Sequence, residues 1–343
     1  MDNSYYILAK ERIEIQRLHI CTWEFPHESS YMEFGFELPY DNIRNNPLTL
    51  HLAVPFIKKD DSVTCLLDNL SNSANGRFIF NDVVSGIDNV GDDPRDGIIL
   101  KFEKREKLTV LPCRITIIDG LISFEIEKPN IHAGNLYFRV LIKIDSDTIA
   151  VRKRGIAQTS YIYDFKINET RNLPQNIYEQ KKNNGLEICK VKKVFCLHAV
   201  PDNFMFSFVD SSKLKNIRKL ESTAFQKYLP EVKGISKDCY NIIFFKDDDC
   251  DGKDSYSLFT ICTEETIGSK QIALAIGANI LCSLLFALSS LRVTNNVSME
   301  WYRQIPWEYW TAFGILSILS IYLFVPIKGV WSWLKTKIKN LKI

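Results

Sequence analysis

Apolar and polar residues alternate with a period of two over most of the first 170 residues. The alternation is clearest in 48–54, 136–144 and 161–167. This pattern is typical of β-strands that bury one face. Between the apolar runs of 115–126, the dipeptide Asp119-Gly120 predicts a two-residue hairpin turn. The sequence therefore predicts a mainly β domain over 1–170, either a β-sandwich or a β-barrel.

A second, smaller domain is predicted after residue 185. The polar stretch 168–185 contains Pro174 and reads as a linker. Strand patterns follow near 186–197, 204–209, 240–245 and 256–262, and a helix is expected from Leu214 to Tyr228 because apolar residues recur there at helical spacing. We therefore expect a small α+β domain over 186–265.

Two long uncharged runs, 272–291 and 309–327, follow this second domain. Each is long enough, as a helix, to cross roughly 30 Å of hydrocarbon. Five of the six tryptophans lie near the ends of these runs, where such rings favour the membrane interface. The alternative, two buried helices of a soluble protein, does not explain that placement. The sequence predicts a C-terminal two-helix transmembrane hairpin.

The charges around this hairpin predict its orientation. Seven lysines flank the two runs on their outer sides, whereas the connecting segment 292–308 has two basic and two acidic residues. The positive-inside rule then predicts a protein of the inner (plasma) membrane with both termini in the cytoplasm. The tail 328–343 has no acidic residue and carries an apolar stripe, so it is expected to lie on an anionic bilayer.

Small residues recur four apart on the first predicted span, with one amide among them. These candidate helix-association residues are Ala273, Gly277, Asn279, Ser283 and Ala287. Small residues let helices approach closely, and a buried amide forms interhelical hydrogen bonds. Packing inside one hairpin is the simpler interpretation; the alternative is a homo-oligomer.

Composition and cysteine usage narrow the class of protein. The chain has 343 residues, a net charge of +2 and nine cysteines without a CxxC pair. These values indicate neither a polycationic nucleic-acid coat nor a disulfide or zinc framework, and they fit a reducing compartment. No secretory signal peptide is expected at the N-terminus.

Basic residues cluster in 171–237, before a segment 238–265 that is rich in acidic residues. The candidate basic patch is Lys190, Lys192, Lys193, Lys213, Lys215, Arg218 and Lys219. It is expected either to contact the phosphates of nucleic acid or lipid headgroups, or to be a solvated face balanced by the acidic segment.

The remaining motifs give little support for a metal site or a catalytic site. Asp247, Asp249 and Asp251 have the order of a calcium loop, but the twelfth position is Leu258 in place of glutamate, so an acidic turn is the simpler interpretation. Cys196 and His198 share one face of a predicted strand; a core pair is the simpler interpretation, and a nucleophile with its base is the alternative. We find no catalytic motif, and we expect no enzyme activity and no cofactor.

The order of parts, a β-rich cytoplasmic region, a two-helix membrane hairpin at 272–291 and 309–327, and a basic tail, resembles the two-transmembrane effectors that accompany retrons in bacterial antiphage defence. This resemblance implies a sensing domain that holds the hairpin inactive. It also implies a reverse transcriptase with its RNA and DNA product as partner, and a hairpin that permeabilises the inner membrane and arrests the infected cell. Two alternatives stay open: a non-toxic, membrane-anchored β-domain binding module or receptor, and a membrane-bound hydrolase.

Overall fold

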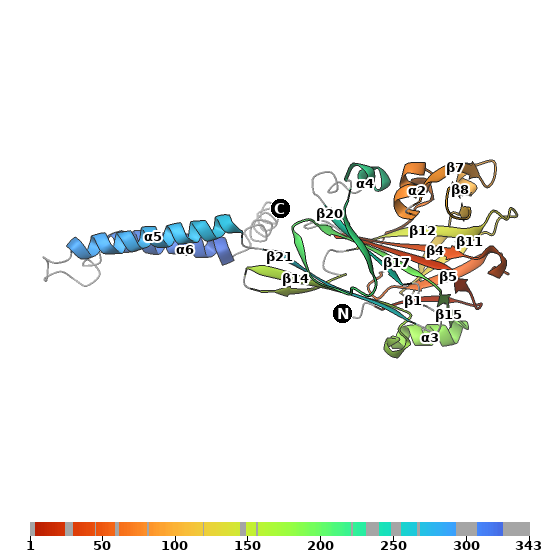
Figure 1. Cartoon of the computed structure of the whole chain (residues 1–343). Coiled ribbons are helices and arrows are strands. Elements are labelled where there is room, and N and C mark those ends of the chain that lie inside the picture. The colour runs from red at the N-terminus through yellow and green to blue at the C-terminus, as the bar shows by residue number, and fades with distance from the viewer. Residues whose placement is uncertain are drawn as a thin grey trace, which may run out of the picture. The chain divides into compact units, whose positions relative to one another are not determined.

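The computed structural model describes residues 4–24, 30–44, 46–58, 62–80, 82–118, 120–144, 149–155, 157–220, 222–230, 240–247, 255–265, 268–292 and 307–324. The chain divides into two compact units, Met1–Glu264 and Glu265–Ile343. The first unit is mainly β, as the alternation predicted, and the second contains two helices (Figure 1).

The strands described in the first unit form two large sheets. The nine-stranded first sheet has the order β10 (Arg114–Ile118), β11 (Leu121–Ile126), β5 (Leu48–Ala53), β1 (Ser4–Ala9), β14 (Gln158–Ile167), β21 (Tyr256–Glu265) and β18 (Phe204–Val209), with β13 (Val151–Arg154) beside β14 and β15 (Glu187–Ile188) beside β1.

The ten-stranded second sheet has the order β19 (Leu214–Lys219), β20 (Tyr240–Asp247), β17 (Val194–Pro201), β3 (Arg17–Trp23), β4 (Ser30–Leu38), β12 (Asn135–Ile144), β9 (Leu108–Val110), β8 (Ile98–Phe102) and β7 (Val84–Asn89), with β6 (Val63–Cys65) beside β12. A separate two-stranded ladder joins β2 (Glu14–Ile15) and β16 (Lys190–Val191).

The two sheets pack face to face around an aromatic core. Tyr5 of β1 lies 5.6 Å from Phe34 of β4, and Phe36 of β4 lies 5.8 Å from Phe124 of β11, measured between ring centroids. All four rings are fully buried. Because alternate residues of a strand point to opposite faces, every second side chain enters this core and the side chains between them lie on the outer faces.

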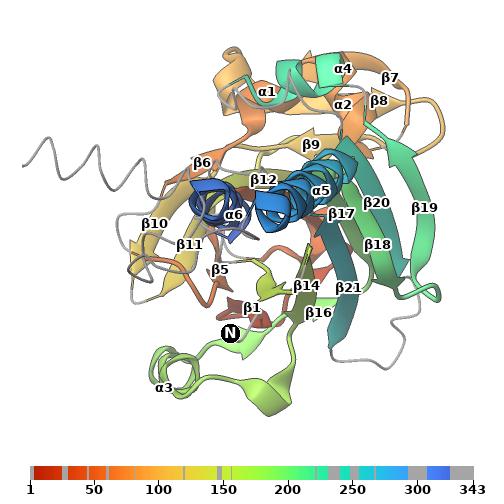
Figure 2. The same ribbon diagram turned by 90° about the vertical axis from the view of Figure 1, so that its left-hand side faces the viewer.

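Short helices cover parts of these outer faces (Figure 2). They are α1 (Leu67–Leu70), α2 (Ser73–Phe80), α3 (Gln175–Asn184) and α4 (Ser222–Tyr228), together with the 3-10 turns Tyr40–Asn42, Pro94–Asp96 and Thr170–Asn172. Phe225 and Tyr228 of α4 pack with Trp23 on the outer face of the second sheet, whereas Ile177 of α3 packs with Leu8 of the first sheet.

Strands from both predicted soluble domains share the same two sheets. β17 pairs in parallel with β3, joining Val194 to Leu18, and β21 lies beside β14. The first compact unit therefore extends from Met1 to Glu264, across the predicted boundary between 1–170 and 186–265. Alternation shows that a strand has a buried face, but not which strand lies beside it.

Two local predictions differ from the structure. The expected linker 168–185 contains α3, which ends at Asn184 and is capped by Gly185 in the left-handed conformation, with φ of 62°. The expected helix from Leu214 to Tyr228 is instead strand β19 followed by helix α4, because Ile217 pairs with Ile243 of β20. In contrast, the predicted hairpin is confirmed: β10 pairs antiparallel with β11, and Gly120 has φ of 81°. Asp119 lies outside the described residues.

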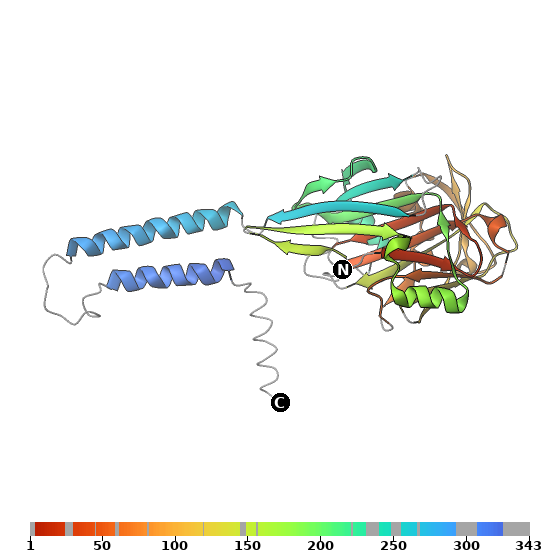
Figure 3. The same ribbon diagram turned by 90° about the horizontal axis from the view of Figure 1, so that it is seen from below.

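The second unit contains α5 (Ser269–Arg292) and α6 (Trp307–Phe324), which overlap the two predicted spans and lie side by side (Figure 3). Cys282 and Ala312 are buried between them, and the rings of Phe286 and Tyr309 are 4.8 Å apart. No helix in the described part of the chain combines the length and apolarity that crossing a membrane requires. The tail 328–343 lies outside that part.

Candidate functional site

A cavity of about 600 Å³ opens on the outer face of the second sheet. Its walls come from β3, β17, β19 and β20, from the end of α2, and from the segments 82–83 and 103–105. Outward residues of three adjacent strands, such as His19, Phe195 and Phe244, form part of its lining. Their neighbours Leu18, Cys196 and Phe245 belong to the core between the sheets. We call this feature the basic–aromatic cavity.

Positive charge dominates the lining. Two acidic residues, Asp82 and Glu103, also line the cavity. The cationic lining residues are Arg17, Lys104, Arg105, Lys215, Arg218 and Lys246. Six cations against two acids leave an excess of four positive charges, which favours an anionic ligand.

Glu37 of β4 positions two of these arginines. Its Oε2 lies 3.0 Å from Arg105 Nη2 and 3.7 Å from Arg17 Nε, and its Oε1 accepts a hydrogen bond from Asn135. The Glu37 side chain is only 5% exposed, so both ion pairs are partly shielded from water. Nη1 of Arg105 is buried and has no hydrogen-bond partner among the described residues. Because this atom is buried, an anion would reach it only if the Arg105 side chain moved.

Aromatic rings lie between the cations. Phe195 of β17 and Phe244 of β20 are stacked at 5.8 Å with an angle of 20° between their planes. The guanidinium of Arg17 lies 4.9 Å from the Phe195 centroid, and Nζ of Lys215 lies 4.8 Å from that of Phe244. Such cation–π contacts hold the charges over the rings. The cavity thus offers flat apolar surface and positive charge side by side.

His19 lies at the inner end of this arrangement. Its ring is 5.5 Å from Phe195 and 5.8 Å from Phe80, and its Nδ1 is 3.0 Å from the hydroxyl of Tyr137. Burial, and then the charges of Arg139, Arg17 and Arg105, hold the pKa of His19 well below its usual value. His19 is therefore neutral at physiological pH and adds no charge to the cavity.

Behind His19, a buried polar network leads away from the cavity. Arg139 of β12 donates from Nη1 to Tyr137 and from Nε to Glu33 of β4. Glu33 also accepts from Trp23 and from Tyr228 of α4, at 2.5 and 2.6 Å. Hydrogen bonds thus connect the cavity wall to α4 without interruption. A buried network of this kind holds its members in one arrangement as long as each is satisfied.

Gly35 of β4 makes room for this network. A Cβ atom at this position would lie 2.0 Å from the hydroxyl oxygen of Tyr137 and 3.2 Å from Nη1 of Arg139. Any larger residue would displace the Tyr137 phenol from its place between His19 and Arg139. The lack of a side chain at position 35 is therefore a requirement of the site.

The structure divides the predicted basic patch. Lys215 and Arg218 line the cavity. Lys192 pairs with Glu14, Lys219 with Asp202 and Lys213 with Asp247, at 2.6, 3.5 and 3.4 Å respectively. Lys190 is exposed on β16, and Lys193 is half-buried.

Sequence reasoning missed four lining cations, Arg17, Lys104, Arg105 and Lys246, because they come from strands and a loop far apart in the chain. The only local signal is that Arg17 and His19 alternate with apolar residues on one strand.

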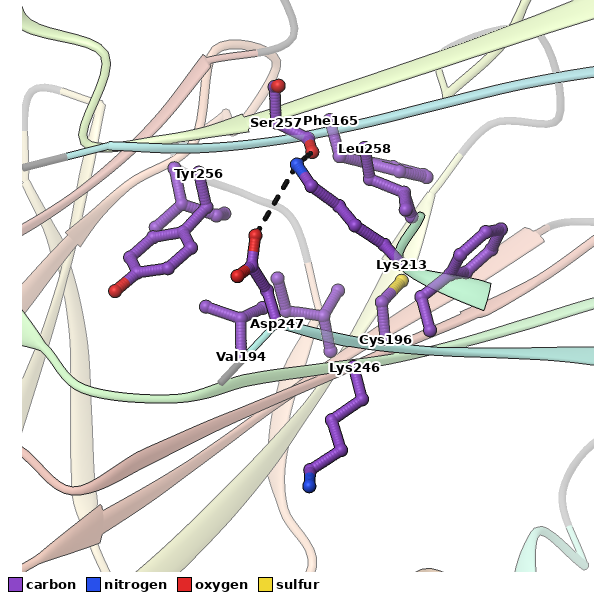
Figure 4. Close-up of a pocket in the computed structure, with 12 residues that line it drawn as sticks. Phe165, Val194, Cys196, Lys213, Lys246, Asp247, Tyr256, Ser257 and Leu258 are labelled. Carbon is purple, nitrogen blue, oxygen red and sulfur yellow. Dashed lines mark hydrogen bonds and ion pairs between the residues drawn. The ribbon is translucent and has the colours of Figure 1, made fainter. Parts of the chain in front are cut away.

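A second, smaller cavity lies between the two sheets and is drawn in Figure 4. Its volume is about 30 Å³, roughly that of one water molecule in the liquid. Nζ of Lys213 reaches Asp247 Oδ2 and the carbonyl oxygen of Ser257, while the Cys196 thiol faces the apolar part. This space is too small for a metabolite and reads as a packing defect beside an ion pair.

The contacts of the described residues do not support a calcium site at Asp247, Asp249 and Asp251. Asp247 is engaged by Lys213. Asp249 and Asp251 lie outside the described residues. Within the described ranges, no three His, Cys, Asp or Glu side chains come close enough together to hold a metal ion.

Cys196 and His198 both lie in the core between the sheets. His198 is 1% exposed, its Nδ1 is 2.5 Å from Thr22 Oγ1, and its ring lies edge-on to Tyr163 at 4.1 Å. Burial lowers the pKa of His198 to about 3 and raises that of Cys196 well above its usual value. A base that cannot take a proton and a thiol that cannot lose one do not form a catalytic pair.

The candidate helix-association residues lie on the exposed surface of α5. Ala273, Gly277, Asn279, Ser283 and Ala287 are all exposed. A Cβ atom on Gly277 would meet nothing within 4 Å, so this glycine is not at the contact with α6. The contact inside the hairpin uses Cys282 and Ala312 instead.

No protein-family model and no curated protein matches the chain.

Proposed function

We propose that this protein is a two-part membrane effector, in which the β unit senses a ligand and controls a helical hairpin that acts on the lipid bilayer. The observation that carries this proposal is the exposed apolar surface of α5 and α6. Ile276 and Ile280 of α5 are 56% and 57% exposed, and Phe313 and Ile318 of α6 are 66% and 70% exposed.

Exposed apolar surface of this extent is unfavourable in water, because the hydrophobic effect disfavours each uncovered side chain. Lipid would cover it without cost, and the tryptophans Trp307 and Trp310, both more than 60% exposed, suit a membrane interface. The apolar runs 272–291 and 309–327 extend beyond the residues whose side chains the structure describes. These features support insertion of the hairpin into a bilayer.

The exposed strip of small residues on α5 supports assembly of several hairpins. A two-helix hairpin cannot enclose a water path alone, because polar groups at membrane depth must be covered by protein or line a filled cavity. Gly277 and Asn279 are not used inside the hairpin. A second copy packing along this strip would bury the Asn279 amide and would begin a pore wall.

The chain connects the two units directly. β21 ends at Glu265 and α5 begins at Ser269, so three residues separate a strand of the first sheet from the hairpin. A short connection transmits a displacement of β21 to the start of α5 more readily than a long flexible linker would. This supports control of the hairpin by the β unit.

The biological setting follows from the resemblance to retron effectors. We propose that the protein works in bacterial antiphage defence at the inner membrane, with both termini in the cytoplasm. Its partner would be a reverse transcriptase with its RNA and DNA product. A reverse-transcriptase gene beside this gene would support the setting, and a neighbourhood without one would count against it.

The test is dye release from vesicles that contain the purified full chain. We expect wild-type protein to release an encapsulated dye, and the Asn279→Leu protein to insert equally well but release little. Membrane-impermeant thiol labelling of single-cysteine variants in cells tests the orientation. Labelling of the β unit from the periplasmic side, or equal dye release by both proteins, would contradict the proposal.

A second candidate function is a non-toxic membrane-anchored binding module. The basic–aromatic cavity favours it, since a receptor needs a ligand site but no pore. The same vesicle experiment separates the two, because an anchored module would release no dye under any condition while keeping its ligand affinity.

A further inference from the structure

We infer that the basic–aromatic cavity binds a nucleoside phosphate, with its base stacked on the Phe195–Phe244 platform and its phosphate on the surrounding cations. The ligand is either a free nucleotide or a residue of a single-stranded nucleic acid. This inference gives a ligand class to the sensing site of the proposed function; binding itself does not depend on what the hairpin does.

A row of side chains crosses four adjacent strands of the second sheet. Arg17 of β3, Phe195 of β17, Phe244 of β20 and Lys215 of β19 follow one another on the outer face, in the order of the strands in the sheet. Each of the two rings, which are 5.8 Å apart, thus has a cation over it, and a base that stacks on a ring would replace that cation at the ring face. A base stacked on the rings has its phosphate within reach of either cation, as in other single-strand binding surfaces.

Arg105 carries one buried donor without an acceptor in the described part of the chain. Arg105 is held by Glu37 through Nη2, yet its buried Nη1 has no acceptor among the described residues. A buried guanidinium donor without an acceptor is costly, and a phosphate oxygen is its best geometric match. Lys104 and Arg218 add charge to the lining of the cavity.

The rings distinguish this ligand from other anions. A lipid headgroup or an acidic peptide would use the cations but has no flat aromatic part for Phe195 and Phe244. Lys215 lies on the edge strand β19, and a lysine there could simply prevent another β-strand from pairing with that edge. That role would not explain two half-buried, stacked phenylalanines beside it.

The size of the cavity agrees with one nucleotide. Ligand pockets for small molecules occupy about 300 to 1,000 Å³, and this cavity has about 600 Å³. β19 also carries Lys219, which is exposed and forms an exposed ion pair with Asp202. A single strand could therefore extend from the cavity along this edge.

The test measures binding to the full chain in detergent by fluorescence anisotropy. The probe is a fluorescein-labelled oligothymidylate of about ten nucleotides. A paired variant, Phe195→Leu with Phe244→Leu, removes stacking but keeps apolar volume. A second pair, Lys215→Gln with Lys246→Gln, removes charge. Phe208→Leu on β18 and Lys153→Gln on β13 are matched controls on the first sheet, where both side chains are exposed.

We expect about tenfold weaker oligothymidylate binding for the ring variant, with pyrophosphate competition unchanged. The charge variant should bind oligothymidylate more weakly and should also be competed less well by pyrophosphate. Its affinity for oligothymidylate should fall less steeply as salt increases, because it makes fewer phosphate contacts. The two controls should behave as wild type. Competition by ATP or thymidine monophosphate then tells a free nucleotide from a strand, since only a free-nucleotide site is emptied by either.

Three results would overturn the inference: no binding of oligothymidylate or nucleotides, equal binding by the ring variant, or equal loss in the controls. Complete competition by phosphatidylglycerol vesicles with no effect of the rings would identify a lipid-headgroup site instead. If the ring variant does not fold, photocrosslinking of a 4-thiothymidine oligonucleotide to wild type replaces it. Crosslinks should then map to β17 or β20, and crosslinks elsewhere would overturn the inference.

These readouts are independent of the proposed effector function. Binding without dye release in vesicles would leave the ligand class intact and overturn the pore. Dye release without nucleotide binding would overturn the ligand class and leave the pore intact.

Discussion

Arg139 and Glu33, on the adjacent strands β12 and β4, form an ion pair of 2.5 Å in which both side chains are completely buried. Burying two charges costs free energy unless their geometry and remaining hydrogen bonds compensate. Here Trp23, Tyr137, Tyr228 and Cys21 supply the remaining partners. The pair lies behind His19 of the basic–aromatic cavity and holds the hydroxyl of Tyr228, so it links the cavity to helix α4.

Removal of one member of this pair should be strongly destabilising. We expect Arg139→Met to lower the free energy of unfolding of the first unit by about 3–5 kcal/mol, because Glu33 is left buried and unpaired. The double variant Arg139→Met with Glu33→Gln should cost clearly less than the sum of the single changes, as a double-mutant cycle would show. Urea unfolding, with hydrogen exchange as the probe, measures the free energy of unfolding of the single and double variants.

The matched control is Lys101→Met, which breaks the ion pair with Asp88, where the two side chains are 38% and 51% exposed. Its cost should not exceed about 1 kcal/mol. An Arg139→Met protein as stable as this control would contradict the buried-pair interpretation.

His198 should make the first unit less stable in mild acid. Burial lowers its folded-state pKa to about 3, from an unfolded value of 6.5. Below pH 6.5 the unfolded chain therefore binds a proton that the folded chain does not. The stabilisation is fully present above pH 6.5 and is lost progressively down to pH 3.

Between pH 7 and pH 5 this difference amounts to about 2 kcal/mol. The His198→Gln protein keeps a polar group beside Thr22 but does not titrate, so its free energy of unfolding should fall by about 2 kcal/mol less than that of wild type. Parallel pH profiles of the two proteins would show that His198 is not the group responsible.

Cys65 should be the most reactive of the described cysteines. A hydrogen bond from the Cys113 thiol lowers the pKa of Cys65 to about 6, whereas burial raises the pKa of Cys21, Cys189 and Cys262 to about 12. The thiolate is the form that reacts with alkylating reagents. At pH 7, iodoacetamide should modify Cys65 first, as mass spectrometry of peptides would show.

The Cys113→Ala change removes that hydrogen bond and should raise the pKa of Cys65, so alkylation at pH 7 should slow by about tenfold. Cys189→Ala serves as the control, since Cys189 is buried apart from this pair. Unchanged kinetics in Cys113→Ala would exclude the thiol contact as the cause.

The exposed strip of α5 should control assembly of the hairpin. Gly277→Leu should block close approach of a second helix by its bulk, and Asn279→Leu should remove an interhelical hydrogen bond worth about 0.6 to 2 kcal/mol. Both proteins should stay in the membrane fraction but lose crosslinked oligomers and dye permeability in cells. Leu274→Ile, on an exposed position outside the strip, is the control. If dye entry survives in both strip variants at equal expression, the hairpin is an anchor.

The sequence alone determined those features that depend on neighbouring residues. Alternation in 48–54 and 136–144 predicted the strands β5 and β12, and Asp119-Gly120 predicted the β10–β11 hairpin. These predictions succeed because strand periodicity and turn geometry act over a few residues. Local pattern failed where pairing overrode it: Ile217 lies in a strand because β20 lies beside it.

Only the tertiary structure decided which strands are neighbours, and with them the site. Val194 pairs with Leu18 in the parallel β17–β3 ladder, which brings Phe195 beside Arg17 across more than 170 residues of chain. Periodicity shows that both residues point away from the core, but each strand has many possible partners with the same pattern. The cavity therefore follows from the pairing of distant strands, and no segment of the sequence contains its cations and rings together.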